Sequence, residues 1–131
     1  MKRTSKVFKG LLGLFLGWLL LAAGSQALAQ NDVWTWGANN YGQIGDGTYT
    51  NKLTPSQVSG VANVTAIDGG GFHTIALKSD GTVWTWGRNY NGEIGDGTWT
   101  DRYAPVQVSG LTGVIAIGGG GYHNIALKSN G

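Results

Sequence analysis

The sequence predicts an all-β repeat protein, and three observations support this prediction. When the sequence is aligned with itself at a shift of 50 residues, 31 of the 49 residue pairs between 33–81 and 83–131 are identical. No part of the repeat shows the 3.6-residue apolar spacing of an amphipathic helix over three turns. Glycine accounts for 24 of the 131 residues and recurs at the same repeat positions, where it is expected to mark turns. A period of this size indicates a solenoid, a propeller or an array.

The first segment, residues 1–29, has the pattern of a secretory signal peptide. Four of the nine basic residues lie within the first nine positions, an apolar run covers 11–23, and small residues precede Ala29. We expect a signal helix that is cleaved after Ala29. About 13 apolar residues at 1.5 Å each are too short for a hydrocarbon core of about 30 Å, which disfavours the alternative of an uncleaved anchor. The mature protein is therefore expected to be secreted, extracellular or periplasmic, with no stable membrane span.

Cleavage would change the charge balance of the protein. The full chain has a formal charge of +2, but residues 30–131 keep five basic and seven acidic residues, a formal charge of −2. The electrostatic argument for nucleic-acid binding is lost with the leader, so we expect no nucleic-acid partner. Because the exported chain contains no cysteine, packing rather than disulfides must stabilise it.

The remaining chain divides into two repeats, residues 30–82 and 83–131. Four short strands are expected in each period, at 64–67, 73–78, 83–86 and 56–58 with their copies. Asp80-Gly81 separates the second and third strands and predicts an antiparallel hairpin with a two-residue type I′ turn. The region 89–97 is expected to be a loop with glycines at its turns.

Several motifs recur in both repeats. They are V-W-T-W-G, W-G-x-N-x-x-G-[QE]-I-G-D-G-T, P-x-Q-V and V-x-A-I-x-G-G-x-[FY]-H-x-I-A-L. In these motifs the chain resembles the regulator of chromosome condensation repeat, whose copies form the blades of a β-propeller. The resemblance implies a partial propeller, with one complete four-stranded blade at 64–108 between half-blades at 33–58 and 114–128. A fold of this kind hosts many activities, so function must be argued from a site.

The sequence given stops in the predicted turn at Asn130-Gly131. Three explanations fit this observation: a fragment of a longer product, a degenerate product, or self-assembly in which half-blades of two chains pair. Unpaired strand edges make such pairing chemically natural.

Recurring polar residues are expected to belong to the framework. His73 and His123 share one repeat position, and we expect their rings to bond backbone groups between blades. A metal site would instead need several converging ligands. The glycine runs lead into strands and not helices, which argues against a phosphate-binding loop. Asp46 and Asp96 are expected to stabilise turns, with a calcium site as the alternative. Thus we expect no catalytic residue, no metal and no cofactor.

The paired tryptophans of the two V-W-T-W-G segments are expected to be structural. They alternate along their strands, so the two members of each pair point to one face of a sheet. We interpret Trp34, Trp36, Trp84 and Trp86 as core between blades, each burying about 150 to 250 Å². The alternative is an aromatic platform for a sugar or a base.

Residues that differ between the repeats are better candidates for recognition. Several such differences fall in the loops after the V-W-T-W-G strands, where binding residues tend to lie. Tyrosine, tryptophan and arginine are enriched at protein interfaces, so we expect partner contacts at Arg88, Tyr90, Trp99 and Arg102. Neutral variation in solvated loops is the alternative.

These observations favour a secreted or surface-exposed, non-catalytic protein that mediates protein–protein or other macromolecular interactions. Known members of the resembled family add guanine-nucleotide exchange with chromatin binding, and inhibition of a secreted enzyme, as alternatives. A carbohydrate-active enzyme or lectin is a further alternative, and the enzyme would need paired carboxylates. Asn63 begins a glycosylation acceptor pattern whose use depends on the host.

Overall fold

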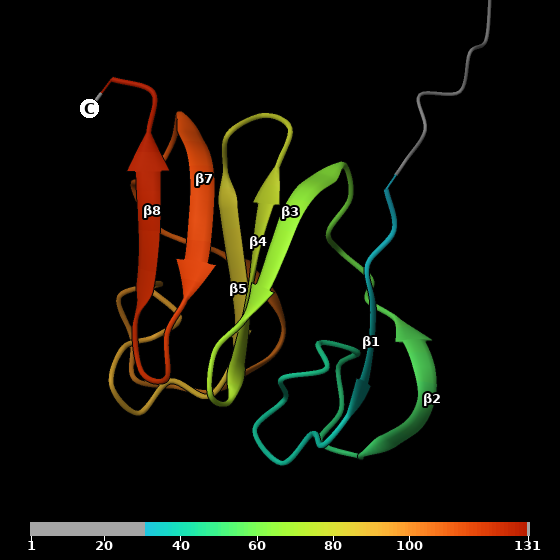
Figure 1. Ribbon diagram of the computed structural model, residues 1–131. Coiled ribbons are helices and arrows are strands. Elements are labelled where there is room, and N and C mark those ends of the chain that lie inside the picture. Colours follow the sequence, from blue (N-terminus) through green and yellow to red (C-terminus); the bar gives the residue numbers. More distant parts are fainter. Residues whose placement is uncertain (1–30, 131) are drawn as a thin grey trace, which may run out of the picture.

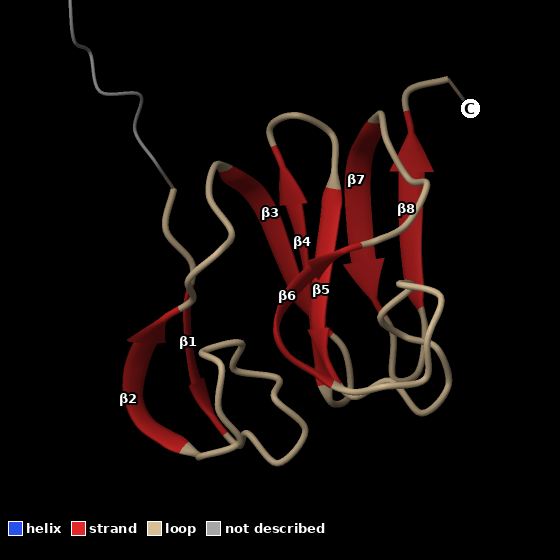
Figure 2. Cartoon of the chain, turned by 180° about the vertical axis from the view of Figure 1, so that it is seen from behind, coloured by secondary structure: helices blue, strands red, loops and turns tan. Residues whose placement is uncertain are grey.

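The structure, a computed structural model, describes residues 31–130, which form β-strands and loops without a helix (Figures 1 and 2). The predicted leader and its cleavage position after Ala29 lie outside the described residues. No helix in the described part is long and apolar enough to cross a membrane. The strands are β1 (Trp34–Gly37), β2 (Lys52–Gln57), β3 (Val64–Gly69), β4 (His73–Lys78), β5 (Val83–Gly87), β6 (Arg102–Gln107), β7 (Val114–Gly119) and β8 (Asn124–Lys128).

The strands form three antiparallel sheets. The central sheet has the order β3-β4-β5-β6, and it lies between the two-stranded sheets β1-β2 and β7-β8. This arrangement confirms the predicted complete blade with a half-blade on each side. The central blade takes β3 and β4 from the first repeat and β5 and β6 from the second, so each repeat is covalently shared between two blades.

Two local predictions are corrected by the structure. Only Gly81 of the Asp80-Gly81 pair has a positive φ, of 77°, and the amide of Gly81 bonds the carbonyl of Lys78 at 3.0 Å. The hairpin therefore has a three-residue loop with a glycine bulge rather than a two-residue type I′ turn. The last strand of each period, predicted at 56–58, instead begins at Lys52 and includes Pro55. Proline is tolerated there because the strand lies at the outer edge of its sheet.

The central blade buries both of its faces. One face and the first half-blade share an apolar cluster that includes Val33, Val58, Ala76 and Trp86. The other face packs on the second half-blade through a cluster of Ile75, Leu77, Val83 and Val114. Alternation along β4 explains the division, because Ile75 and Leu77 point to one face and Ala76 to the other.

Trp86 connects the two repeats most directly. Its indole is fully buried, and Nε1 donates a hydrogen bond of 2.9 Å to the carbonyl oxygen of Gln43. Gly45 makes room for the ring, since a Cβ at this position would lie 2.5 Å from Nε1. The hydroxyl of Thr74 donates to the same Gln43 oxygen at 3.0 Å. The Gln43 carbonyl and the backbone of Gly45 together form the site that holds the indole, and we call this site the tryptophan seat.

The expected burial of the four tryptophans is only partly correct. Trp86 is buried and Trp84 packs partly against the same cluster, whereas Trp34 and Trp36 are 53% and 64% exposed. The reason is structural, because the first repeat supplies the seat of Trp86 but the described residues contain no earlier repeat that could supply one for Trp36.

Replacement of Trp86 should therefore be costly. Trp86→Ala is expected to lower the free energy of unfolding by about 3 to 5 kcal/mol, because it leaves a large cavity. Trp86→Phe, which keeps most of the burial but loses the bond to Gln43, should cost less. Urea unfolding followed by circular dichroism at one protein concentration measures both changes. Ile115→Ala, at an exposed position on β7, is the matched control and should change stability by less than about 1 kcal/mol. Equal losses for Trp86→Ala and Ile115→Ala would contradict this assignment.

Candidate functional site: an arginine held among aromatic rings

The loops after β1 and β5 are each organised by a buried asparagine. Asn89 accepts a hydrogen bond from the amide of Ile94 and donates to the carbonyl oxygens of Thr98 and Thr100. Asn39 makes the equivalent bonds in the first repeat. Both side chains are fully buried. The recurring W-G-x-N motif contains this residue, but its role follows only from contacts to backbone atoms five to eleven residues away.

A recurring aspartate stabilises the second half of each of these two loops. Asp96 accepts hydrogen bonds from the amide and hydroxyl of Thr98 at 2.9 and 2.7 Å, and from Arg102 Nε at 2.6 Å. Burial raises the pKa of Asp96, but the bonds from Thr98 and Arg102 outweigh it, so the pKa lies below its usual value. Asp46 is held in the same way by Thr48 and Lys52. Arg102, predicted as a partner contact, therefore stabilises its own loop.

Arg88 occupies a different environment, among four aromatic rings. Its guanidinium carbon lies 4.9 Å from the ring centroid of Tyr90. The centroids of the other three rings lie 5.3 to 5.8 Å away, and they belong to Tyr41, Phe72 and Tyr122. Tyr41 also makes edge-to-face contacts with Phe72 and Tyr90 at 5.2 and 6.1 Å. We call these five residues the Arg88 cluster.

The Arg88 cluster joins all three sheets at one end of the molecule. Tyr41 lies in the loop after β1, Phe72 in the β3-β4 turn and Tyr122 in the β7-β8 turn, and these segments meet at the lower end of Figure 1. Arg88 and Tyr90 directly follow β5, and the amide of Arg88 bonds the Phe72 carbonyl at 2.9 Å. Phe72, Tyr90 and Tyr122 remain 42%, 61% and 60% exposed, so the cluster forms a surface.

Three of the five residues of the cluster differ from the residues at the equivalent positions of the other repeat. The positions equivalent to Arg88, Tyr90 and Tyr41 are occupied by Ala38, Asn40 and Asn91. The structure thus brings together two of the four predicted contact residues, Arg88 and Tyr90. It leaves out Trp99, which lies exposed beside Gly92, and Arg102.

Sequence reasoning missed Tyr41, Phe72 and Tyr122 as members of the cluster. Phe72 and Tyr122 belong to the recurring [FY]-H motif, so nothing in the pattern distinguishes them from structural residues. Tyr41 lies far from Arg88 along the chain, and its exchange with Asn91 was the one available signal.

The histidine at the start of β4 links adjacent blades through a side chain. His73 is buried, and its Nε2 donates to the amide oxygen of Asn124 at 2.9 Å. The donor assignment follows because the amide nitrogen of Asn124 donates to the Glu93 carbonyl at 2.7 Å, which turns the amide oxygen toward His73. The partner is therefore an amide side chain and not the expected backbone group. His123 is exposed.

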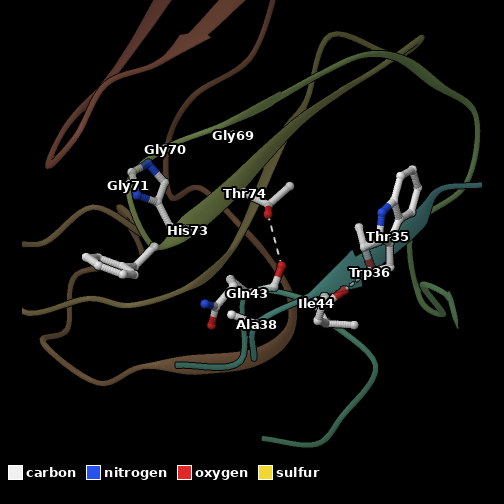
Figure 3. A pocket seen from close by; sticks show the side chains of 11 residues that line it. Thr35, Trp36, Ala38, Gln43, Ile44, Gly69, Gly70, Gly71, His73 and Thr74 are labelled. Atoms are coloured by element: carbon white, nitrogen blue, oxygen red, sulfur yellow. Dashed lines mark hydrogen bonds between the residues drawn. The ribbon is translucent and has the colours of Figure 1, made fainter. Parts of the chain in front are cut away.

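Cavities between the loops and the inner hairpins recur with the repeat. One, of about 300 Å³, is lined by residues that include Trp36, Gln43, His73 and Thr74 (Figure 3). A second, of about 320 Å³, is lined by the equivalent Glu93, His123 and Asn124. The two cavities share equivalent lining positions, but the second also reaches Gly95 and Val108, whose equivalents Gly45 and Val58 pack against Trp86 in the first repeat. Among residues 31–130, no group of three or more histidine, aspartate or glutamate side chains is placed to hold a metal ion.

The low pKa of Asp96 predicts a loss of stability in acid. A carboxyl group whose folded pKa is depressed stabilises the fold above its unfolded pKa of about 3.9, and this contribution is lost as the pH falls through the folded pKa. Asp96→Asn should cost about 2 kcal/mol at pH 7 and weaken the dependence of stability on pH below about 4. Urea unfolding between pH 2 and 7 measures both effects.

Asp101→Asn is the control for this measurement. Asp101 accepts a bond from the Asn89 amide, and Asn51 already fills the same role in the first repeat. The control should therefore stay close to wild type at pH 7. An acid dependence of Asp96→Asn identical to that of the wild type would contradict the assignment.

Comparison with known proteins agrees with this architecture. The regulator of chromosome condensation (RCC1) repeat matches residues 30–77 and 80–127, and a second model of this repeat matches 64–93. Human WBSCR16 is similar in structure, with a TM-score of 0.69 and 26% identity over 76% of this chain and 27% of that one.

Two yeast structures are also similar. Yeast RCC1 (Prp20) bound to Kap60 gives a TM-score of 0.66 and 22% identity over 77% of this chain and 27% of that chain. Prp20p from Saccharomyces cerevisiae gives 0.63 and 24% over 77% and 28%. The sequence thus spans about a quarter of the length of these β-propeller proteins. With both repeats matched over most of its length, the chain belongs to the regulator of chromosome condensation (RCC1) repeat family.

Proposed function

We propose that this protein is an exported, non-catalytic propeller-repeat protein that binds another protein or a cell-surface macromolecule through the Arg88 cluster. The observation that carries the proposal is that Arg88, Tyr90 and Tyr41 depart from the repeat pattern and lie together on a surface where Phe72, Tyr90 and Tyr122 are exposed. A framework role would be expected to recur at the equivalent positions, but Ala38 and Asn40 stand where Arg88 and Tyr90 would be. The proposal of export depends on the charged, apolar and small-residue segments within residues 1–29.

The chemistry of the cluster suits protein recognition. Tyrosine and arginine are enriched among the residues that contribute most to binding energy. The guanidinium of Arg88 lies near four rings, and Tyr41 contacts both Phe72 and Tyr90, so these side chains already occupy defined positions. A surface ordered in this way loses less side-chain entropy when a partner binds.

The similar proteins support protein binding as a class of function. The titles of two of their structures describe yeast RCC1 bound to Kap60, and binding of Prp20p to Gsp1p and histones. Those partners belong to those proteins. We infer a different partner for this chain, because the predicted leader directs it outside the compartment in which histones are bound.

Binding should depend on the residues that distinguish the second repeat. A photo-reactive benzophenone group placed at Tyr90 is expected to cross-link a protein from the extracellular fraction of the producing cells. The same group at Asn40, the equivalent position of the first repeat, should not. For the partner so obtained, Arg88→Ala should weaken binding by about 30-fold, which corresponds to the roughly 2 kcal/mol of an interface anchor.

The controls separate recognition from folding. Arg88→Ala should still fold, with a loss of about 1 to 2 kcal/mol from its contacts with the four rings, whereas Asn40→Ala should unfold close to the wild type and keep full affinity. If the two probes capture the same proteins, or if Arg88→Ala binds as tightly as the wild type, the Arg88 cluster is not the recognition surface.

Export is tested separately from binding. The protein collected outside the producing cells should begin at Gln30, because Ala29 completes the cleavage pattern. Mass spectrometry and amino-terminal sequencing identify the first residue. Ala27→Arg with Ala29→Arg should block processing, because the cleavage site requires small residues at these positions. Full-length protein retained in the cytoplasm of wild-type cells would contradict the proposal.

A further inference from the structure

Arg88 carries a positive charge that no carboxylate among residues 31–130 pairs directly. Its Nε atom is buried and has no hydrogen-bond partner in this part of the chain. Arg88 also belongs to none of the ion pairs of the described residues, which join Lys52 to Asp46, Lys78 to Asp80 and Arg102 to Asp96. A guanidinium group has five N–H donors and is always charged, so an arginine in this state is able to accept an anion.

The repeat fold does not require an arginine at this position. The first repeat has Ala38 there, and Asn39 organises its loop in the same way as Asn89 does in the second. The position is also enclosed on both sides, because Tyr41 follows the preceding sheet and Tyr122 belongs to the following one. A buried donor without an acceptor destabilises a folded protein, and departures of this kind are typical of functional sites.

The carboxylate of Glu93 lies near this charge but is engaged elsewhere. Glu93 is buried, and its two oxygens accept hydrogen bonds from the amide and the side chain of Asn91 at 2.8 and 3.0 Å. Burial raises the pKa of Glu93, but backbone and Asn91 hydrogen bonds and the charge of Arg88 outweigh it, so the pKa lies below its usual value. Glu93 therefore stays ionised beside Arg88 without forming an ion pair with it.

The aromatic rings hold the guanidinium without using its N–H groups. A cation over a ring interacts with the ring face, and a planar guanidinium in this position still donates hydrogen bonds in its own plane. Arg88 as a whole is half-buried, and Tyr90 and Tyr122 beside it are exposed. A ligand therefore approaches the outer Nη groups, whose forked geometry matches the two oxygens of a carboxylate.

The surrounding charges favour a single carboxylate over a polyanion. The other basic residues of segments 38–52 and 88–102 are Lys52 and Arg102, and each is bound to an aspartate. Together these two segments hold four acidic and three basic side chains. A phosphate group carries about 1.5 to 2 negative charges and is recognised by clusters of arginines. One unpaired guanidinium in slightly acidic surroundings instead matches one negative charge.

We propose that the Arg88 cluster binds an exposed aspartate or glutamate side chain of the partner protein. The carboxylate meets the Nη groups of Arg88, and Tyr90 and Tyr122 pack against the apolar carbons next to it. This inference rests on the proposed function and adds the chemical group that the surface recognises.

Nuclear magnetic resonance of the isotope-labelled protein tests carboxylate recognition without a known partner. The probe is N-acetyl-glutamate methylamide, titrated at low ionic strength, where charge pairs are least screened. The Nε–H signal of Arg88 should shift and reach saturation. The Nε–H signal of Arg102 is the internal control and should not move, because this group already donates to Asp96. The uncharged N-acetyl-glutamine methylamide should leave both signals in place.

Two results of this titration would overturn the proposal. The first is the same response of Arg88 to the glutamate and the glutamine compounds, including no response to either. The second is a stronger response to N-acetyl-phosphoserine methylamide or to methyl glucuronide than to the glutamate compound. That outcome would indicate a phosphorylated protein or an acidic polysaccharide in place of a carboxylate side chain.

A partner captured through Tyr90 allows a second, independent test. Each acidic residue in its cross-linked segment is replaced by the corresponding amide, alone and together with Arg88→Gln. One replacement should weaken binding about 30-fold, and the double change no further, because both remove the same contact. Additive losses at every acidic position would overturn the carboxylate proposal but leave the Arg88 cluster as a recognition surface. Failure to capture any protein would contradict the proposed function instead, and the titration would then decide carboxylate recognition alone.

Discussion

The burial of the Trp86 indole on the preceding repeat is the contact on which the rest of the structure depends. A single repeat cannot satisfy it, because the ring and its seat at Gln43 and Gly45 lie about one period apart in the sequence. Around the ring, β4 bonds in both directions: Thr74 reaches back to Gln43 and His73 reaches forward to Asn124. These contacts fix the position of each sheet relative to the next, and so the positions of the loops that follow β1 and β5.

Much of the fold could be predicted from the sequence, because the repeat is a local pattern. The pairing of β4 with β5 follows from the shared motifs, and the division into a blade and two half-blades follows from the resemblance to the propeller repeat that these motifs carry. Turn geometry was harder to predict, because Asp-Gly is compatible with two hairpin types and the choice depends on one φ angle at Asp80. Burial of Trp36 was predicted wrongly, because a ring at this position is buried only where a preceding sheet packs against it. The same five residues, V-W-T-W-G, give a buried ring in the second copy and an exposed ring in the first.

The Arg88 cluster shows the same limit for the candidate site. Arg88 and Tyr90 could be found because they differ from Ala38 and Asn40 at equivalent positions. Tyr41 and Tyr122 could not, since they lie 47 and 34 residues away from Arg88 in the sequence, on either side of it, and meet only when three sheets are stacked. Arg102 was chosen by residue type, but in the folded chain its charge is engaged by Asp96 within one loop.

The residues that differ between repeats therefore fall into two groups with different surroundings. Leu53 and Trp99 are exposed apolar residues, on the first half-blade and in the loop after β5. Arg88, Tyr90 and Tyr41 lie with Phe72 and Tyr122 at one end of the blades, where aromatic rings surround the guanidinium. Because three of its five members depart from the repeat, the Arg88 cluster gives this end of the blades a chemistry that the equivalent positions of the first repeat lack.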